Sequence, residues 1–140
     1  MPGTNETVEK KLDFEDESVI YAVNEPLLLE ASAGSGKTTV LVERYLASVL
    51  FLYFYGKKSH YESVRSVVAV TFTRKAASEM KDRVRSRISG RFNGEYLQNT
   101  ISMLEKYNGI SIPGSDAAIA RLLETKEELL QAVLSAPIST

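Results

Sequence analysis

The chain has 140 residues, of which 44% are hydrophobic and 25% charged, and its formal net charge is −1, as in an ordinary globular domain. It has no cysteine and a single histidine, His60, which excludes disulfides, thiol catalysis and multi-histidine metal sites and fits a reducing cytoplasm. The most apolar stretch, residues 45–55, is too short for a membrane span of about 20 residues. We therefore expect a buried helix there and no membrane partner.

Charge is unevenly distributed along the chain. Residues 1–30 contain eight acidic residues against Lys10 and Lys11, whereas residues 31–91 contain twelve lysines and arginines against four acids. The middle third of the chain therefore predicts a surface for a polyanion.

The first elements expected in chain order lead from a polar tail to a long helix. Residues 1–13 are polar and are expected to be flexible, and the spacing from Phe14 to Val23, with acids in its first turn, predicts a short helix. Leu27 to Leu29 form an apolar run that predicts a buried parallel strand. A helix is then expected from Thr39 to about Tyr55, and we interpret its FLYFY run as core, or as contact surface for the remainder of a longer protein, and not as a base-stacking patch.

The second half of the chain repeats this order. Residues 56–63 have loop composition, with His60 as an ordinary loop residue, and the β-branched residues 66–72 predict a second buried strand. Thr73 is placed to cap a helix that runs to about Ile88. Its expected buried stripe is Ala76, Met80, Val84 and Ile88. Further helices are expected over residues 95–107 and 116–134. This order predicts an α/β fold, with a parallel sheet and crossover helices.

One segment between the first strand and the first long helix carries a chemical signature. Ala31 to Thr38 (ASAGSGKT) fits a phosphate-binding loop with alanine in place of its first glycine. Gly34 and Gly36 allow successive N–H groups to point at one anion, and the helix N-terminus adds partial positive charge. Lys37 is then predicted to reach the outer phosphates, and the Thr38 hydroxyl to ligate magnesium. The alternative is a glycine-rich turn that only joins a strand to a helix.

We therefore predict ATP and Mg²⁺ as cofactors, with Lys37 and Thr38 as catalytic residues and Thr38 as the metal ligand. The nucleotide-binding residues are predicted to be Ala31, Ser32, Ala33, Gly34, Ser35, Gly36, Lys37, Thr38 and Thr39. Hydrolysis also requires a carboxylate, usually at the end of another buried strand. No later apolar run ends in Asp-Glu, and Glu124, Glu127 and Glu128 fit a solvated helix face. We expect these residues alone to be inactive.

Two segments together resemble a known family. Leu27 to Leu46 and Val67 to Val84 are similar to motifs I and Ia of the UvrD-like superfamily-one DNA helicases, and the loop resembles that of the RecB/AddA branch of ATP-dependent helicase–exonucleases. Residues 120–140 resemble the stretch before that family's next motif. The resemblance implies that residues 1–140 are the N-terminal part of a RecA-like P-loop NTPase motor domain, incomplete here, with residues 92–140 as a mainly helical subdomain or insertion. Ser18 stands where the family has a glutamine that reads adenine, which puts adenine selectivity in doubt.

The resemblance also implies a DNA contact. Thr71, Phe72, Thr73 and Arg74 are placed on the track of single-stranded DNA, and Lys75 follows them. An aromatic ring stacked on a base contributes about 1–3 kcal/mol whatever the sequence. The alternative is a solvated basic helix with Phe72 in the core.

The predicted function is the ATP-binding part of a DNA helicase or ATP-dependent exonuclease, which couples hydrolysis to movement on single-stranded DNA in cytoplasmic repair and recombination. Its expected partners are single-stranded DNA, the remainder of its own helicase chain and a second helicase–nuclease subunit. Two alternatives remain open. One is a small P-loop nucleoside or nucleotide kinase, and the other is a nucleotide-dependent DNA-binding module that does not hydrolyse.

Overall fold

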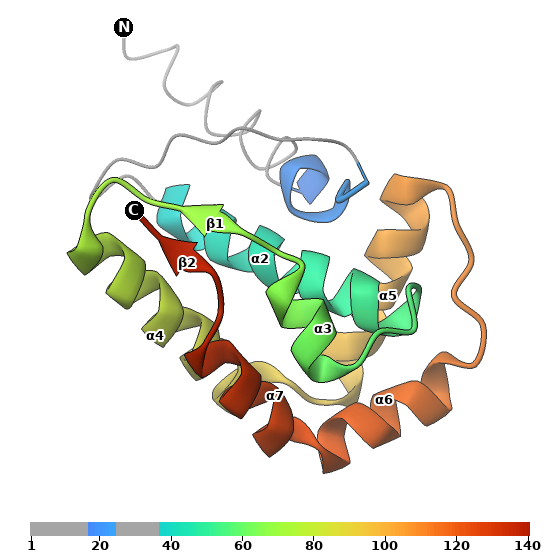
Figure 1. Ribbon diagram of the computed structural model, residues 1–140. Helices are drawn as coiled ribbons and strands as arrows, with labels where there is room; N and C mark the ends of the chain where they lie inside the picture. Colours follow the sequence, from blue (N-terminus) through green and yellow to red (C-terminus); the bar gives the residue numbers. More distant parts are fainter. Residues whose placement is uncertain (1–16, 25–36) are drawn as a thin grey trace, which may run out of the picture.

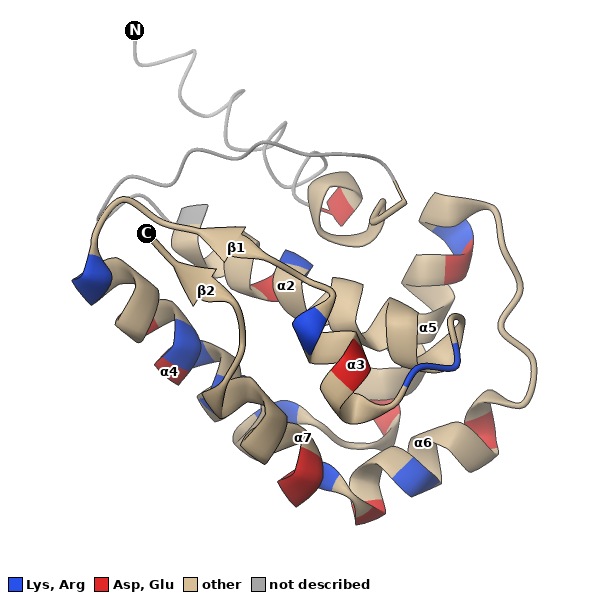
Figure 2. Cartoon of the chain, viewed as in Figure 1, with Lys and Arg blue, Asp and Glu red and all other residues tan. Residues whose placement is uncertain are grey.

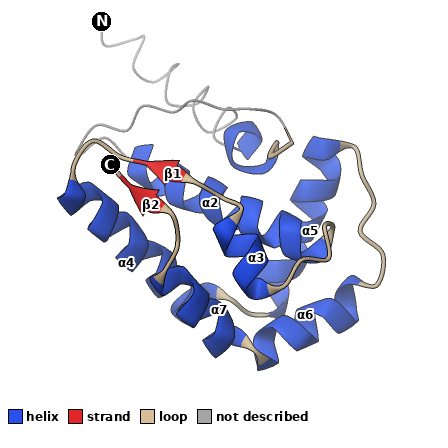
Figure 3. Ribbon diagram, in the orientation of Figure 1, coloured by secondary structure: helices blue, strands red, loops and turns tan. Residues whose placement is uncertain are grey.

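The computed structural model describes residues 17–24 and 37–140, and these are mostly helical (Figures 1 and 3). Residues 17–21 are helical, within the range expected for the first helix. The remaining elements are α2 (Lys37–Phe54), α3 (His60–Arg65), β1 (Ala69–Val70), α4 (Arg74–Arg91), α5 (Gly94–Asn108), α6 (Ser115–Glu124), α7 (Lys126–Leu134) and β2 (Ile138–Ser139). The strand expected at Leu27 to Leu29 and loop residues 31–36 lie outside the described residues.

The described residues form one small parallel sheet. Strand β1 pairs with β2, with Ala69 opposite Ile138 and Val70 opposite Ser139. Helices α4 to α7 lie between the two strands in sequence, so the connection is the helical crossover that parallel strands require. The parallel pairing agrees with the α/β expectation, although β2 itself was not predicted.

The prediction of a fully buried strand over residues 66–72 is wrong. Regular pairing covers only Ala69–Val70, and Val68, Val70 and Phe72 are 66%, 67% and 72% exposed. Successive side chains of a strand point to opposite faces, and only the face that carries the buried Ala69 is covered by described residues. The strand is therefore half-buried.

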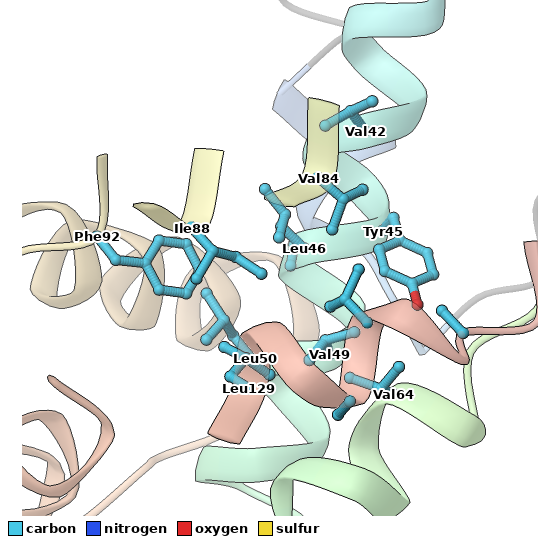
Figure 4. Close-up of a cluster of buried hydrophobic side chains, with 14 of the residues drawn as sticks. Val42, Tyr45, Leu46, Val49, Leu50, Val64, Val84, Ile88, Phe92 and Leu129 are labelled. Carbon is cyan, nitrogen blue, oxygen red and sulfur yellow. The ribbon is translucent and has the colours of Figure 1, made fainter. Parts of the chain in front are cut away.

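Helix α2 forms the centre of the hydrophobic core. Its apolar residues recur at the three- and four-residue spacing of a buried helix face, which confirms the helix expected from residue 39 to about 55. Figure 4 shows this face meeting side chains from α3, α4 and α7. The α2 residues buried there are Val42, Tyr45, Leu46, Ala47, Val49, Leu50 and Phe54. Within the FLYFY run, Phe54 is buried, Phe51 and Tyr53 pack against the core while partly exposed, and Tyr55 is 46% exposed, so the interpretation as core holds fully for Phe54 alone.

Helix α4 begins as the sequence predicts. The Thr73 hydroxyl accepts a hydrogen bond from the Ala76 N–H at 3.0 Å, which satisfies one free donor of the first turn. Met80, Val84 and Ile88 are buried as expected, but the fourth member of the stripe is Ala77 and not Ala76. The helix continues to Arg91, one turn beyond the expected end.

Two other expectations need correction. Residues 56–63 are not all loop, because Ser59 caps the short helix α3, in which the largely buried His60 stacks on Tyr53 with ring centroids 5.0 Å apart. The helix expected over residues 116–134 is divided at Thr125, whose hydroxyl donates to the Arg121 carbonyl at 2.7 Å. A side chain that bonds to the preceding turn competes with the regular helix, and α7 starts in a new direction.

Candidate nucleotide and DNA sites

The described part of the predicted nucleotide site is the first turn of α2. The helix begins at Lys37, directly after the glycine-rich loop, and Thr38 is half-buried while Thr39 is exposed. The first N–H groups of a helix have no partner within it, and together with the helix dipole they favour an anion. The described residues therefore include the helix end of the predicted anion site. Loop residues 31–36, predicted to complete that site, lie outside them.

The predicted DNA residues follow the carboxyl end of β1. The Thr71 N–H donates to the Ser139 carbonyl at 2.7 Å, and the Thr71 hydroxyl can donate to the carbonyls of Thr73 (3.1 Å) or Ser139 (3.2 Å). Because Thr73 caps α4, both threonines are held by backbone bonds. Phe72 lies between these anchors. The backbone of residues 71–73 is thus held in place, and the Phe72 ring stays exposed.

Phe72 is among the most exposed large apolar residues that the structure describes, at 72%. The alternative that places it in the core is therefore wrong. A ring held between two anchored threonines, at the end of a strand, is available for stacking on a planar partner. Contact with DNA itself stays a prediction.

Arg74 and Lys75 open α4 beside this ring. Both are exposed, and within the described residues neither has an ion pair or hydrogen bond. Two cations at a helix N-terminus are opposed by the helix dipole and do not stabilise the helix. Their charges are consequently free for an anionic partner.

A polar network connects the helices that begin at the two sites. Glu43 of α2 accepts a hydrogen bond from Arg87 of α4 at 2.7 Å and another from the Tyr96 hydroxyl of α5 at 3.2 Å. Both charged side chains are largely shielded from water, so the pair is screened less than a surface pair. In Figure 1, α2 and α4 begin at the same end of the molecule. The network joins the second turn of α2 to the last third of α4, so it fixes how these two helices pack on each other.

The strongest pKa shifts lie in this interior and not at the predicted sites. Burial, together with the charge of Glu43 and the hydrogen bond to it, raises the pKa of the Tyr96 hydroxyl well above its usual range. Burial alone raises the pKa of Tyr45 to about 12. Both phenols stay neutral at physiological pH, so they act as parts of the packed core and not as acid–base groups.

Of the predicted magnesium site, the described residues include Thr38 alone. Among residues 17–24 and 37–140, no group of three or more histidines, aspartates or glutamates is placed to hold a metal. Thr38 offers one hard oxygen at the start of α2, which fits an ion that takes oxygen ligands and keeps several waters when it binds beside phosphate. The donor set is compatible with Mg²⁺ bound together with a nucleotide, and not with Mg²⁺ alone.

Comparison with known families places the chain in one of them. Residues 12–132 match the UvrD/REP helicase N-terminal domain, and the chain belongs to that family. It is also similar to curated proteins that are named as one subunit of an ATP-dependent helicase/nuclease. The protein from Pediococcus pentosaceus is 37% identical over 108 residues, which cover 74% of this chain, and the protein from Lactobacillus johnsonii is 35% identical over 102 residues, or 70% of this chain.

The chain spans about 8% of the length of each of these two relatives. A third relative of the same name, from Lactobacillus delbrueckii, is 46% identical over 65 residues, which cover 46% of this chain and 5% of that protein. No solved structure matches the chain. In the part of the chain that the structure describes, no helix has the length and apolar character needed to cross a membrane.

Sequence reasoning did not predict strand β2, which lies beside the predicted DNA segment Thr71–Arg74. Strand β2 supplies the Ser139 carbonyl that holds Thr71, and β2 with α4 borders a hollow that also contains Ser78 and Lys81. A two-residue strand has too few positions to show an alternating pattern. Its one sequence signal is the apolar Ile138 after Pro137, and that is too short to distinguish a strand from a turn.

Proposed function

We propose that this chain is the nucleotide- and DNA-binding beginning of an ATP-driven DNA helicase with a RecA-like P-loop fold. Ala31 to Thr39 hold the triphosphate of ATP, and Thr71 to Arg74 hold single-stranded DNA. One observation carries the proposal. The two helices that start at these segments begin at the same end of the molecule and are joined by the Glu43–Arg87 ion pair. The ion pair fixes how the two helices pack, and this packing links the two binding segments in the proposed motor.

Each residue has a role in binding and orientation. The first N–H groups of α2 face the phosphates, the Lys37 ammonium balances their charge, and the Thr38 hydroxyl completes the shell of a magnesium ion. When bound, Mg²⁺ neutralises charge on the phosphates. Hydrolysis needs a further carboxylate that positions the metal and water. We accordingly propose that residues 1–140 bind nucleotide without turning it over.

The activity of the whole protein is the wider part of the proposal. Hydrolysis is coupled to movement on single-stranded DNA, in cooperation with the remaining motor polypeptide and a second helicase–nuclease subunit. Residues 92–140 form a mainly helical subdomain of the first motor lobe or an insertion in it, with β2 at its end joining the sheet. Membership of the helicase family and the name of the relatives support this version, with its cytoplasmic role in DNA repair. The same membership weighs against a nucleoside kinase.

The nucleotide site is tested by Lys37→Ala in the intact protein, with Lys58→Ala as the control. Lys58 is exposed in the loop after the far end of α2. A ligand present at 100 times its dissociation constant stabilises the folded state by about 2.7 kcal/mol. We expect a non-hydrolysable ATP analogue with Mg²⁺ to raise the melting temperature of the unsubstituted protein and of Lys58→Ala, and not that of Lys37→Ala. An equal shift in all three proteins contradicts the phosphate-loop assignment.

A further inference from the structure

Helix α4 carries more positive charge than the predicted DNA contact uses. Its basic residues are Arg74, Lys75, Lys81, Arg83, Arg85, Arg87 and Arg91, against Glu79 and Asp82. Within the described residues, Arg87 alone among these forms an ion pair, and Lys81 donates to the Leu134 carbonyl at 3.1 Å. Figure 2 shows basic residues at the start of α4 and again along its length. Most of this charge is therefore exposed and unbalanced by a described partner.

Two shallow hollows follow one another along the exposed side of α4. The first is lined by Arg74, Ser78 and Lys81 together with residues 138–140 at the end of β2. The second lies further along the helix, and its lining residues are Asp82, Arg85, Ser86, Ser89 and Gly90. Each hollow combines small serine side chains with at least one long cation. The small serine side chains let a polymer lie close to the helix, and the long cationic side chains can then contact that polymer.

The cations and serines share one stripe of the helix. Residues three and four apart are neighbours on a helix surface, so Arg74, Ser78, Lys81 and Arg85 lie in a row. At 1.5 Å per residue, the row is about 16 Å long. Phosphates of an extended single strand are further apart than the axial rise of about 3.4 Å in one B-form strand, so this row spans fewer than about five nucleotides. The row starts at Arg74, where the predicted DNA segment ends.

We propose that this row, the α4 stripe, is a second phosphate-binding surface, along which single-stranded DNA continues from Thr71–Arg74 down α4. The inference rests on the proposed function, because it extends the same DNA site. Arg74, Lys81 and Arg85 contact phosphate oxygens, and the Ser78 and Ser89 hydroxyls donate to others. Lys81 keeps its bond to the Leu134 carbonyl and shares its remaining protons with the DNA. Asp82 lines the second hollow beside Arg85 and reduces the positive charge there, whereas Glu79 lies further round the helix and repels the strand from that side.

The chemistry of the stripe favours nucleic acid over an acidic protein. Arginine, lysine and serine are the side chains that most often contact phosphate oxygens. Anchors of protein interfaces are enriched in tryptophan and tyrosine as well as arginine, and they lie in well-packed, desolvated pockets and not in shallow open hollows. The two hollows offer only Ala77 and Ile138 as apolar lining, and both of these side chains are buried. A uniform, charged polymer fits such a surface, and a peptide with large anchors does not.

The test compares Arg85→Gln with Arg83→Gln in the intact protein. Both arginines are exposed, and neither has a described partner. They lie two positions apart, which is about 200° around a helix, so Arg83 is on the opposite side from the stripe. The readout is the dissociation constant for a labelled thymidine oligonucleotide between 50 and 200 mM salt, with a blunt duplex as a second ligand. Each single-strand phosphate contact contributes about 0.7 to the salt slope, or about threefold in affinity across that range.

We expect Arg85→Gln to weaken binding of the single strand and to lower its salt slope by about 0.7, while Arg83→Gln retains the slope of the unsubstituted protein. Equal slopes for the two variants overturn the stripe. If Arg85→Gln weakens binding of the duplex alone, the proposal is also overturned, because the stripe is assigned to single-stranded DNA. If the unsubstituted protein binds neither DNA, the proposed function fails with it. If it binds single strands but Arg85 makes no difference, only the stripe is wrong.

Discussion

The inner side of α2 and the open side of β1 use apolar residues in opposite ways. Along α2, Leu46 and Leu50 are each only 1% exposed in the core that this helix forms with its neighbours. Along β1, Val68, Val70 and Phe72 are apolar and yet mostly exposed. Burying an aliphatic side chain stabilises a fold by about 1.5–3 kcal/mol, so the first region carries stability. The second region contributes little to stability and is free to serve recognition.

The largest expected effect is on the free energy of unfolding, when a buried side chain of α2 is truncated. Leu50→Ala removes a side chain that is 1% exposed and leaves a cavity among α2, α4 and α7, which costs about 2–5 kcal/mol. Val70→Ala, in the exposed row of β1, should change the free energy of unfolding by less than about 0.5 kcal/mol. Urea unfolding of the two variants measures the difference. Similar losses in both would mean that β1 is covered on both faces.

A smaller and selective effect is expected at Phe72. Phe72→Ala should leave the stability of the fold almost unchanged, because the ring is 72% exposed. It should weaken binding of single-stranded DNA by about 1–3 kcal/mol through the loss of base stacking. In the intact protein we expect unwinding to fall more than nucleotide binding, measured by strand separation and by the nucleotide-induced thermal shift.

Tyr61→Ala is the matched control for Phe72, because Tyr61 is an aromatic residue that is 51% exposed on α3. It should change neither DNA binding nor unwinding. If Phe72→Ala instead reduces nucleotide binding and unwinding equally, its ring supports the fold and does not stack on DNA.

The sequence predicted the long helices better than the short elements. Helices α2, α4 and α5 each have at least 15 residues, enough for the helical period to show, and Thr73 marks the start of α4. Helix α3 has six residues of loop-like composition, and its formation depends on the Ser59 cap and on packing against α7. The break at Thr125 depends on one hydroxyl bond to Arg121, which periodicity cannot register. Short elements are decided by such tertiary contacts.

The candidate sites likewise include features that the sequence could predict and features that it could not. The segment Thr71–Arg74 could be found because the resemblance to the helicase family falls on it. The hollow beside it could not, because it combines Lys81 of α4 with residues 138–140, which are distant in sequence and meet only through the parallel pairing. The half-exposed β1 was also missed. A seven-residue segment that is almost wholly apolar predicts burial on both faces, and which face is covered is decided by other elements.

The smallest effect is expected at the opposite end of α2, where His60 is packed against Tyr53, Thr125 and Glu128. The Thr125 hydroxyl donates to the Arg121 carbonyl, so the His60 Nε2–H must donate to the Thr125 oxygen at 2.6 Å. Nδ1 is then unprotonated, and it is buried without a hydrogen-bond partner among the described residues. Burial lowers the pKa of His60 below its usual value of 6.5, while Glu128, 72% exposed, acts weakly in the opposite direction.

A lowered pKa in the folded state means that the unfolded chain binds the proton more readily. His60 therefore contributes its full share of stability above about pH 6.5, and that share is lost as the pH falls toward the lower pKa of the folded state. The free energy of unfolding, measured from pH 7.5 to pH 5, should decline less steeply in His60→Gln than in the unsubstituted protein. If both decline alike, the acid sensitivity comes from carboxylates, and the contact between α3 and α7 does not depend on the protonation of this imidazole.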